Sequence, residues 1–509
     1  MPPNWPVCGQ GIPACGAARV RDDSGCWAHL SPVEFEQALA QLSPGVTLDL
    51  RGTMVKSSWL ARILDCVRDP ATGQARLGSL RCDQAGFGDP ISLCHLTVLG
   101  SASFSAASFG AASFRASRFA DRTDFAGADF AGDAAFTDVC FGKFASFADA
   151  TFGTVLFAGV RSTADVSFER ATVATSMTLD NTQITGTLTL TGLHASGEVD
   201  IRAEAPAVHS ERARFGGRVR LQLAGATLWL TDSIFDQPAT VAPWPRTGLG
   251  NARSWVDYPP VALRSMRGVD AEHLTLSDTD LGCCLIYGLQ RPDELRLAGS
   301  CRFAPTPGGW YWRKIIPWRW TSREALYEEH LWRRTSPTAG LGWTKAVRGE
   351  AEDPQVGLPP RPAQLAVLYR QLRQAVETAR NEPGAADLYY GEMEMRRLST
   401  TRAGERWLLN LYWLVSGYGL RASRAMVILA GVVLAAAEVL QRVGFGTRHS
   451  PGYLNCLLYA ISSLLSLDLP GRLPAVLTDS GQAVRIVLRI GGPVLLGLAA
   501  LAVRGRIKR

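Results

Sequence analysis

Several features common in secreted proteins are missing from this sequence. The first residues, MPPNWPVCGQ, have neither a basic start nor an apolar core, so we expect no cleavable signal peptide. The 11 cysteines form no dense, evenly spaced framework. This scatter disfavours a disulfide-stabilised extracellular domain and favours reduced thiols in the cytosol.

Catalytic motifs are missing as well. The chain has no Gly-x-Gly-x-x-Gly before a predicted helix, no phosphate-binding loop, no His-Glu-x-x-His and no nucleophile elbow. Glu392 and Glu394 are two residues apart, which places them on different faces of a helix and disfavours an acid–base pair. Of the seven histidines, only His29 has neighbours typical of a metal site. We therefore predict that the protein is not an enzyme.

Lysine is scarce, and the charge is close to balanced. Lys and Arg together number 53 against 46 acidic residues, which gives a net charge of +7. This excess is small for 509 residues, and we expect no nucleic-acid partner. The length exceeds what one ordinary hydrophobic core serves, so the chain should fold as several domains.

Phenylalanine recurs every five residues in ASFSAASFGAASFRASRF, which spans 102–119. The spacing matches neither the period of a helix nor that of a strand. A large apolar residue can be buried every fifth position only if the chain turns a corner every five residues. The units are Ala102-Ser-Phe104, Ala107-Ser-Phe109, Ala112-Ser-Phe114, Ala128-Asp-Phe130, Ala145-Ser-Phe147 and Ala150-Thr-Phe152.

These units resemble the pentapeptide-repeat family, whose usual unit is A-[DN]-[LF]-x-x. The resemblance covers roughly residues 96–241 and implies a right-handed, four-sided β-solenoid with four units per coil. As in other repeat proteins, each coil would be stabilised mainly by its neighbours. We expect the solenoid to extend over 96–305 and to be degenerate after 241.

The register of the repeat changes after Phe119. Steps of five and six alternate, with extra residues at Arg122, Asp133 and Phe144. We infer coils of about 22 residues with bulges on two opposite edges. Later coils replace Phe with aliphatic pairs that should share one face, namely Met177/Leu179, Leu188/Leu190 and Val199/Ile201. The insertions are either merely tolerated or form a stacked ridge for a partner.

A group of soft metal ligands lies in the Gly- and Pro-rich arm at 1–30. Cys8, Cys15, Cys26 and His29 have the spacing C-x6-C-x10-C-x2-H. Four such ligands suit a structural, tetrahedral zinc ion with no open position for catalysis. The opening spacing is wider than usual, and unliganded thiols on an arm are the alternative.

Residues 31–95 read as an α/β cap for the solenoid end. Ser31-Pro32-Val-Glu34 predicts a helix start with a capping box. The segment 46–52 reads as a strand and 54–67 as an amphipathic helix. A cap is expected because an uncovered solenoid end would expose a sheet edge.

The last hundred residues, 406–509, read as a membrane domain. The segments 425–443 and 483–503 are each about long enough to span a bilayer. Arginines precede the first and basic residues follow the second, which places both termini and the solenoid in the cytoplasm. We expect a multi-pass protein of the bacterial inner membrane, with the lipid bilayer as one partner.

Two shorter segments complete the predicted membrane domain. The segment 406–424 mixes Trp and Tyr with Arg and favours an interfacial helix. The segment 453–469 is apolar and ends at Pro470-Gly471, as in a re-entrant helix. The order resembles two-span potassium-channel pore domains, but the filter sequence TVGYG is absent. A conducting pore and a plain or degenerate anchor are both considered.

Residues 306–405 read as a mainly helical linker. WYWRKIIPWRW at 310–320 suits packing at a domain junction, lipid contact or, least, stacking on nucleic-acid bases. A helical hairpin should follow from Pro362, with a break at Asn381–Gly384. The stretch NEPGAADLYYGEMEMRR resembles bacterial membrane-linked pentapeptide-repeat proteins with a C-terminal two-span, degenerate ion-channel-like region, a resemblance that implies architecture and no activity.

Three functions fit these features. The first is a membrane-anchored cytosolic scaffold that binds an unidentified protein through its solenoid. The second is a ligand-gated, two-span channel with the solenoid as sensor, which requires a homo-oligomer. The third, carried by the resemblance to soluble pentapeptide-repeat proteins, is a DNA mimic that binds topoisomerase. From 101 to 150 six Asp face four basic residues, too few for an imitation of DNA.

Overall fold

The computed structural model of the 509-residue chain forms two compact units, Met1–Pro359 and Pro360–Arg509. The structure describes residues 4–11, 14–21, 25–244, 260–308, 311–313, 316–318, 320–336, 343, 358–445, 452–465 and 477–507. Statements below refer to these residues, and each unit is described by itself.

The first unit opens with two helices beside the solenoid end. Helix α1 spans Pro32–Leu39, and its start has the predicted capping box between Ser31 and Glu34. Helix α2 spans Ser57–Cys66 and buries Leu60, Ile63 and Leu64. The prediction of an amphipathic helix in 54–67 is confirmed. Its apolar side chains lie against the interior of the first coils, beside Leu48, Leu50, Leu77, Leu80, Phe87 and Leu93.

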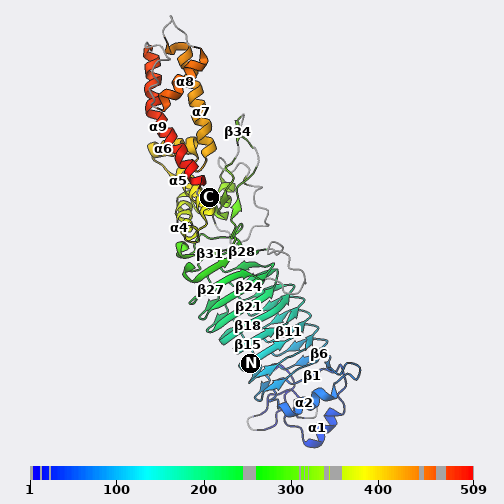
Figure 1. Cartoon of the computed structure of the whole chain (residues 1–509). Helices are drawn as coiled ribbons and strands as arrows, with labels where there is room; N and C mark the ends of the chain where they lie inside the picture. Colours follow the sequence, from blue (N-terminus) through cyan, green and yellow to red (C-terminus); the bar gives the residue numbers. More distant parts are fainter. Residues whose placement is uncertain are drawn as a thin grey trace. The chain divides into compact units, whose positions relative to one another are not determined.

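Parallel strands then stack into a β-solenoid of about ten turns (Figure 1). One parallel sheet consists of β1 (Leu48–Asp49), β3 (Leu80–Arg81), β7 (Ala102–Ser103), β11 (Thr123–Asp124), β14 (Ala145–Ser146), β17 (Val166–Ser167), β19 (Thr187–Thr189), β22 (Ala207–His209), β25 (Thr227–Trp229), β28 (Val261–Ser265) and β30 (Thr279–Asp280). The ladder therefore begins at Leu48, inside the segment 31–95 for which the sequence predicts a cap.

The remaining solenoid strands form a second, larger sheet. Its members are β2 (Ala75–Leu77), β4 (Gly86–Phe87), β5 (Ile91–Ser92), β6 (Leu96–Val98), β8 (Ser108–Phe109), β9 (Ala112–Ser113), β10 (Arg118–Phe119), β12 (Asp129–Thr137), β13 (Cys140–Phe141), β15 (Thr151–Ala158), β16 (Arg161–Ser162), β18 (Thr172–Ile184), β20 (His194–Ala195), β21 (Glu198–Glu204), β23 (Arg214–Phe215), β24 (Val219–Ala224), β26 (Ile234–Phe235), β27 (Ala239–Pro243), β29 (Leu274–Ser277) and β31 (Arg296–Ala298). A coil such as 102–119 contains four short strands, β7 to β10.

The strand register confirms the predicted coil length and its irregularity. Ala102 pairs with Thr123 and Thr123 with Ala145, so the ladder alternates between 21 and 22 residues per coil. A register shift follows Phe130, where the sequence predicts an extra residue at Asp133. Further along, Val208 pairs with Leu228, a step of 20. The insertions are therefore confined to the earlier coils.

The interior of the solenoid consists of stacked apolar columns. Parallel rings stack from coil to coil as Phe87–Phe109–Phe130–Phe152, Phe104–Phe125–Phe147–Phe168, Phe114–Phe136 and Phe119–Phe141. The aliphatic pairs predicted to replace them, from Met177 to Ile201, are buried as expected. Because these side chains fill the rod, its outer surface is what remains for recognition.

The far end of the first unit mixes short strands with a helix. Antiparallel pairs join β32 (Ala304–Pro305) to β35 (Glu324–Ala325) and β33 (Tyr311–Arg313) to β34 (Ile316–Trp318). The expected helical linker thus begins with β-structure, which suits the alternating Trp and Ile side chains. Helix α3 (Tyr327–Thr335) follows, and short 3₁₀ turns η2 (Ala271–His273) and η3 (Pro292–Glu294) lie in the preceding coils.

The second unit starts with the predicted helical hairpin. Helix α4 spans Pro362–Thr378 and α5 spans Glu382–Ser399, with Asn381 capping α5 through the backbone N–H of Gly384. The helices approach closely at Gly391, where a Cβ atom would lie 2.4 Å from the Tyr369 ring. The break predicted at Asn381–Gly384 is confirmed within one or two residues.

Four further helices follow: α6 (Ala403–Ser416), α7 (Ala422–Val439), α8 (Tyr453–Leu464) and α9 (Asp479–Ile507). A π-helical turn, η5 (Leu440–Gly444), extends α7. Helices α7, α8 and α9 share a core of Ala436, Ala437, Leu440, Cys456, Ala460, Leu464 and Leu488. The predicted segments 406–424, 425–443, 453–469 and 483–503 thus fall largely on these helices, and the end of the third lies outside the described residues.

One described helix is long and apolar enough to cross a membrane. The segment Arg424–Gly444 has 21 residues and a mean hydropathy of 1.9, and 17% of its most apolar window is buried. Helix α9 covers the second predicted span but does not meet the same criterion over its described residues. One such helix is weak evidence, and a two-span membrane domain remains a prediction.

Candidate metal centre

A short backbone hairpin positions the first two candidate ligands. The N–H of Cys8 donates to Ala17 O at 2.8 Å, and the N–H of Gly9 donates to Cys15 O at 2.8 Å. The return bond runs from the N–H of Cys15 to Gln10 O. Gly9 and Gly11 adopt positive φ, which glycine permits without strain. The hairpin brings two thiols that are seven residues apart to one end of the turn.

A single helical turn positions the other two ligands. The backbone N–H groups of His29 and Leu30 both donate to Cys26 O, at 2.8 and 3.1 Å. Residues three apart on such a turn share one face, so the Cys26 thiol and the His29 ring point the same way. The turn leads directly into Ser31, the N-cap of α1.

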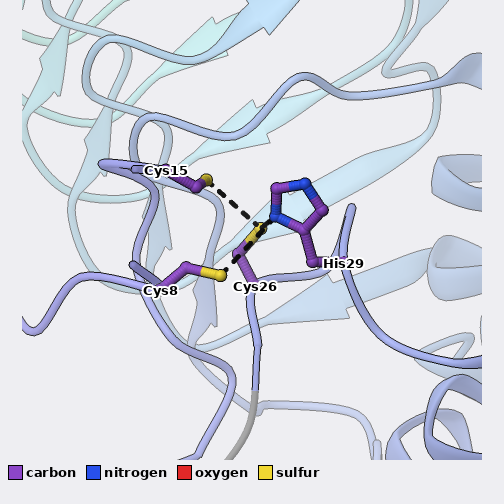
Figure 2. Close-up of side chains that lie close together, drawn as sticks. All are labelled: Cys8, Cys15, Cys26 and His29. Carbon is purple, nitrogen blue, oxygen red and sulfur yellow. Dashed lines mark hydrogen bonds between the residues drawn. The ribbon is translucent and has the colours of Figure 1, made fainter. Parts of the chain in front are cut away.

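The four side chains converge on one point (Figure 2). Their ligand atoms all lie within 4.8 Å of one another. Cys8 Sγ and Cys26 Sγ lie 3.5 and 3.4 Å from His29 Nδ1, and the sulfurs of Cys15 and Cys26 are 3.9 Å apart. A tetrahedral ion with bonds of about 2.0 to 2.3 Å gives ligand–ligand edges of roughly 3.5 to 3.8 Å. The predicted set of Cys8, Cys15, Cys26 and His29 therefore forms a cluster that could bind a metal ion.

The electrostatics of the thiols fit a cation. Burial raises the pKa of Cys26 to about 12, and the neighbouring Cys15 and Cys8 thiols raise it further, because a thiolate here would be desolvated beside like groups. Burial also raises the pKa of Cys8, but backbone hydrogen bonds at Cys26 and Gln10 outweigh this effect and lower it to about 7. A bound cation would stabilise all three thiolates. The sulfur distances exclude a disulfide, which requires about 2.05 Å.

The candidate centre is attached to the first solenoid coil. The backbone N–H of Ala18 donates to Arg51 O at 2.8 Å, beside the edge strand β1. The guanidinium of Arg51 lies over the Trp5 ring at 4.9 Å, and the Trp5 indole donates to Gly16 O. Gly52 has a φ of +64°, and a Cβ there would meet Ala17 at 3.2 Å. The arm is therefore fixed against the coil rather than hanging free.

An aromatic cluster makes a second connection, which the sequence analysis missed. Trp27 follows Cys26 and stacks on Trp59 of α2 at 6.4 Å, while Phe35 of α1 packs edge-on against both rings. Trp27 is buried. The signal was available, since all three aromatics lie in segments predicted to be helical or turn-like, but their contact required the tertiary structure.

A buried charge cluster at the far end of the unit was also missed. Arg323 and Arg333 both bind the Glu329 carboxylate at 2.7 Å, and all three side chains are almost fully buried. Arg333 also lies over the rings of Trp320 and Trp343, at 4.9 and 4.7 Å. Glu329 and Arg333 are spaced i, i+4 on α3, which was the detectable signal.

The remaining candidate groups stay apart. Glu392 pairs with Arg370 on α4 at 2.9 Å, whereas Glu394 pairs with Arg397 at 2.7 Å, so the two carboxylates face different partners. Cys284 is buried and Cys283 is half-buried, as expected for small packing residues. Within the described residues, Cys8, Cys15, Cys26 and His29 are the group with metal-ligand geometry.

Comparison of the chain with protein-family models, with curated proteins and with solved structures found no match. The resemblance to pentapeptide repeats therefore rests on the sequence units, the β-solenoid and its phenylalanine columns, with which that architecture is consistent.

Proposed function

We propose that the protein is a membrane-anchored scaffold whose solenoid binds a protein partner on the cytoplasmic face of the bacterial inner membrane. The observation that carries the proposal is the pairing of a filled, elongated repeat unit with a helical unit that exposes apolar side chains. The first offers surface without an internal ligand cavity, and the second has a surface suited to lipid.

The apolar outer face of α7, α8 and α9 supports the anchor. Exposed side chains include Met426, Val427, Leu434, Val443, Leu454, Leu458, Ile486, Val487, Ile490 and Val494. Exposed apolar patches of this kind mark membrane or protein contacts. Arg421 and Arg424 at the start of α7, with Arg504, Arg506, Lys508 and Arg509 near the chain end, support cytoplasmic termini.

The charge pattern of the rod supports protein recognition over DNA mimicry. Asp149 pairs with Arg170 at 2.7 Å, and Arg202 and Arg220 contact Asp180 and Asp200 on adjacent coils. Carboxylates that neighbouring arginines neutralise cannot reproduce the continuous negative charge of a duplex. We therefore rank the topoisomerase-binding reading last.

We also propose that the Cys8, Cys15, Cys26 and His29 cluster holds a structural zinc ion. Three thiols and one imidazole with tetrahedral spacing are typical of zinc, and no fifth group approaches the centre among the described residues. Zinc would link the hairpin at Cys8 and Cys15 to the turn before α1. Its role would be to hold this arm against Arg51 and Gly52 at the solenoid end.

Alkaline extraction and crosslinking of the full chain test the scaffold. The protein should stay with inner membranes after carbonate washing. Photo-crosslinkers at exposed positions on one solenoid side, such as Leu156 and Ile234, should capture the same partner repeatedly. Release by carbonate would contradict the anchor, and capture that does not recur between positions would contradict the scaffold.

A ligand-gated channel is the second candidate, favoured by the position of α8. This short apolar helix packs against both α7 and α9 through Cys456, Ala460 and Leu464, as a pore helix would. One pore helix per chain requires a homo-oligomer. Ion flux from proteoliposomes, with Pro470→Ala as a variant, tests this reading. A monomer in detergent and the absence of flux would both contradict it.

A further inference from the structure

Helix α6 carries an unpartnered apolar stripe along one face. Trp407, Leu411 and Leu414 are spaced i, i+4 and i+7, and Leu408 lies beside them. Between 43% and 68% of each of these four side chains is exposed. Four large apolar side chains in a row on a short helix are far more than isolated surface residues, so this face is suited to an apolar contact.

The opposite face of α6 is fixed to the rest of its unit. Leu409 is buried, and Trp413 lies between two guanidiniums, those of Arg397 at 4.9 Å and Arg424 at 5.3 Å. The Trp413 indole donates to the Tyr390 hydroxyl on α5 at 3.1 Å. The helix is therefore held by one side, and the apolar stripe is left facing outward by its own packing.

Positive charge surrounds the stripe. Residues 396–424 contain six arginines and one acidic residue, Glu405, which pairs with Arg396 at 3.0 Å. Arg406 and Arg424 donate to the neutral carbonyls of Thr400 and Trp413, so these bonds leave their charge uncompensated. Within the described residues, no carboxylate pairs with Arg402, Arg406 or Arg424.

We propose that α6 lies flat on a membrane surface containing anionic phospholipid, with the apolar stripe among the upper acyl chains and the arginines at the headgroup phosphates. The proposal rests on the proposed anchor and deepens it, since α6 leads through Gly417 and Arg421 into the candidate span. An apolar face beside uncompensated arginines matches the combination that an anionic bilayer surface offers. A phosphate-bearing macromolecule would meet the arginines but leave the stripe exposed.

Amide hydrogen exchange of the full chain in lipid nanodiscs tests this assignment. Discs of phosphatidylcholine alone are compared with discs that also contain phosphatidylglycerol. We expect amides of 407–414 to exchange several-fold more slowly in the anionic discs. Arg402→Gln with Arg406→Gln should abolish this difference, and Trp407→Ser with Leu411→Ser should remove the protection in both lipids.

The matched control is Arg62→Gln with Arg68→Gln, which removes two exposed arginines from α2 and its flank in the other unit. It should keep the full lipid dependence. Equal exchange of α6 in both lipids, in a chain that resists carbonate extraction, would overturn the inference and leave the anchor standing. A chain released by carbonate that still binds phosphatidylglycerol vesicles through Arg402 and Arg406 would instead contradict the anchor and support α6.

Discussion

The rings of Phe104 and Phe125 lie parallel, with centroids 4.5 Å apart and planes 2° from one another. They are 21 residues apart and occupy the same position in successive coils, above one another in the rod. This separation is close to the strand spacing of a β-sheet, so the side-chain column and the backbone ladder advance together. Each ring is stabilised mainly by the coils before and after it, which makes the stack cooperative.

Truncation of a stacked ring should be costly only inside the rod. Phe125→Ala should lower the free energy of unfolding by about 3–5 kcal/mol, because the cavity cannot collapse between two fixed coils. Phe144→Ala is the matched control: this ring occupies a predicted insertion and lies under the Arg122 guanidinium at 5.7 Å. It should cost less than about 1 kcal/mol. Urea unfolding followed by far-ultraviolet circular dichroism measures both, and equal losses would contradict the columnar core.

The metal cluster should hold one ion per chain. Elemental analysis of the purified protein should find zinc at equimolar amounts, and Cys26→Ser should lose it, because Cys26 is the fully buried ligand and its thiolate needs a cation. Loss of the ion should also speed hydrogen exchange in 4–21 several-fold. Cys66→Ser, at an exposed cysteine outside the cluster, should keep both metal and protection. Equal metal content in both variants would refute the site.

The close approach of α4 and α5 makes Gly391 sensitive. Gly391→Ala should destabilise the hairpin by about 1–3 kcal/mol, because the new Cβ would lie 2.4 Å from the Tyr369 ring and force it to move. Gly404→Ala is the control, since a Cβ there meets nothing within 4 Å. That change should be neutral or stabilise α6 by about 0.5–1 kcal/mol, as alanine is the better helix former. Hydrogen-exchange protection of α4 and α6 distinguishes the two outcomes.

The buried His330 should make the end of the first unit sensitive to acid. Burial lowers its pKa from 6.5 to about 4, an effect that Glu329 opposes and that Arg323, Arg333 and Arg334 reinforce. Below pH 6.5 the unfolded chain therefore binds a proton that the folded chain refuses. Stability that is complete above that pH should fall progressively toward pH 4, by about 2 kcal/mol at pH 5.

Hydrogen exchange of α3 at pH 7 and pH 5, corrected for intrinsic rates, measures this loss. His330→Phe retains the ring contact with Trp343, whose centroid lies 4.6 Å away, and removes the titrating group. The variant should show little pH dependence between these values. A pH response as large as that of the native chain would assign it to another group.

Much of the solenoid was predictable because its rule is local. A phenylalanine every five residues, with an extra residue at Arg122, Asp133 and Phe144, determines coil length without knowledge of distant contacts. The four metal-ligand candidates were also identifiable, since cysteine and histidine in a short Gly- and Pro-rich arm have few other uses. The capping box at Ser31 and the helix break near Asn381 depend on neighbouring residues alone.

The tertiary structure decided what depends on residues far apart in the chain. It started the parallel ladder at Leu48, because Leu48 pairs with Leu80 across 32 residues that show no pentapeptide spacing. It brought the hairpin of Cys8 and Cys15 to the turn of Cys26 and His29, and joined both to Arg51. It also buried Arg323, Glu329 and Arg333 together. Side-chain periodicity encodes which face of an element is apolar, but only packing determines which distant face covers it.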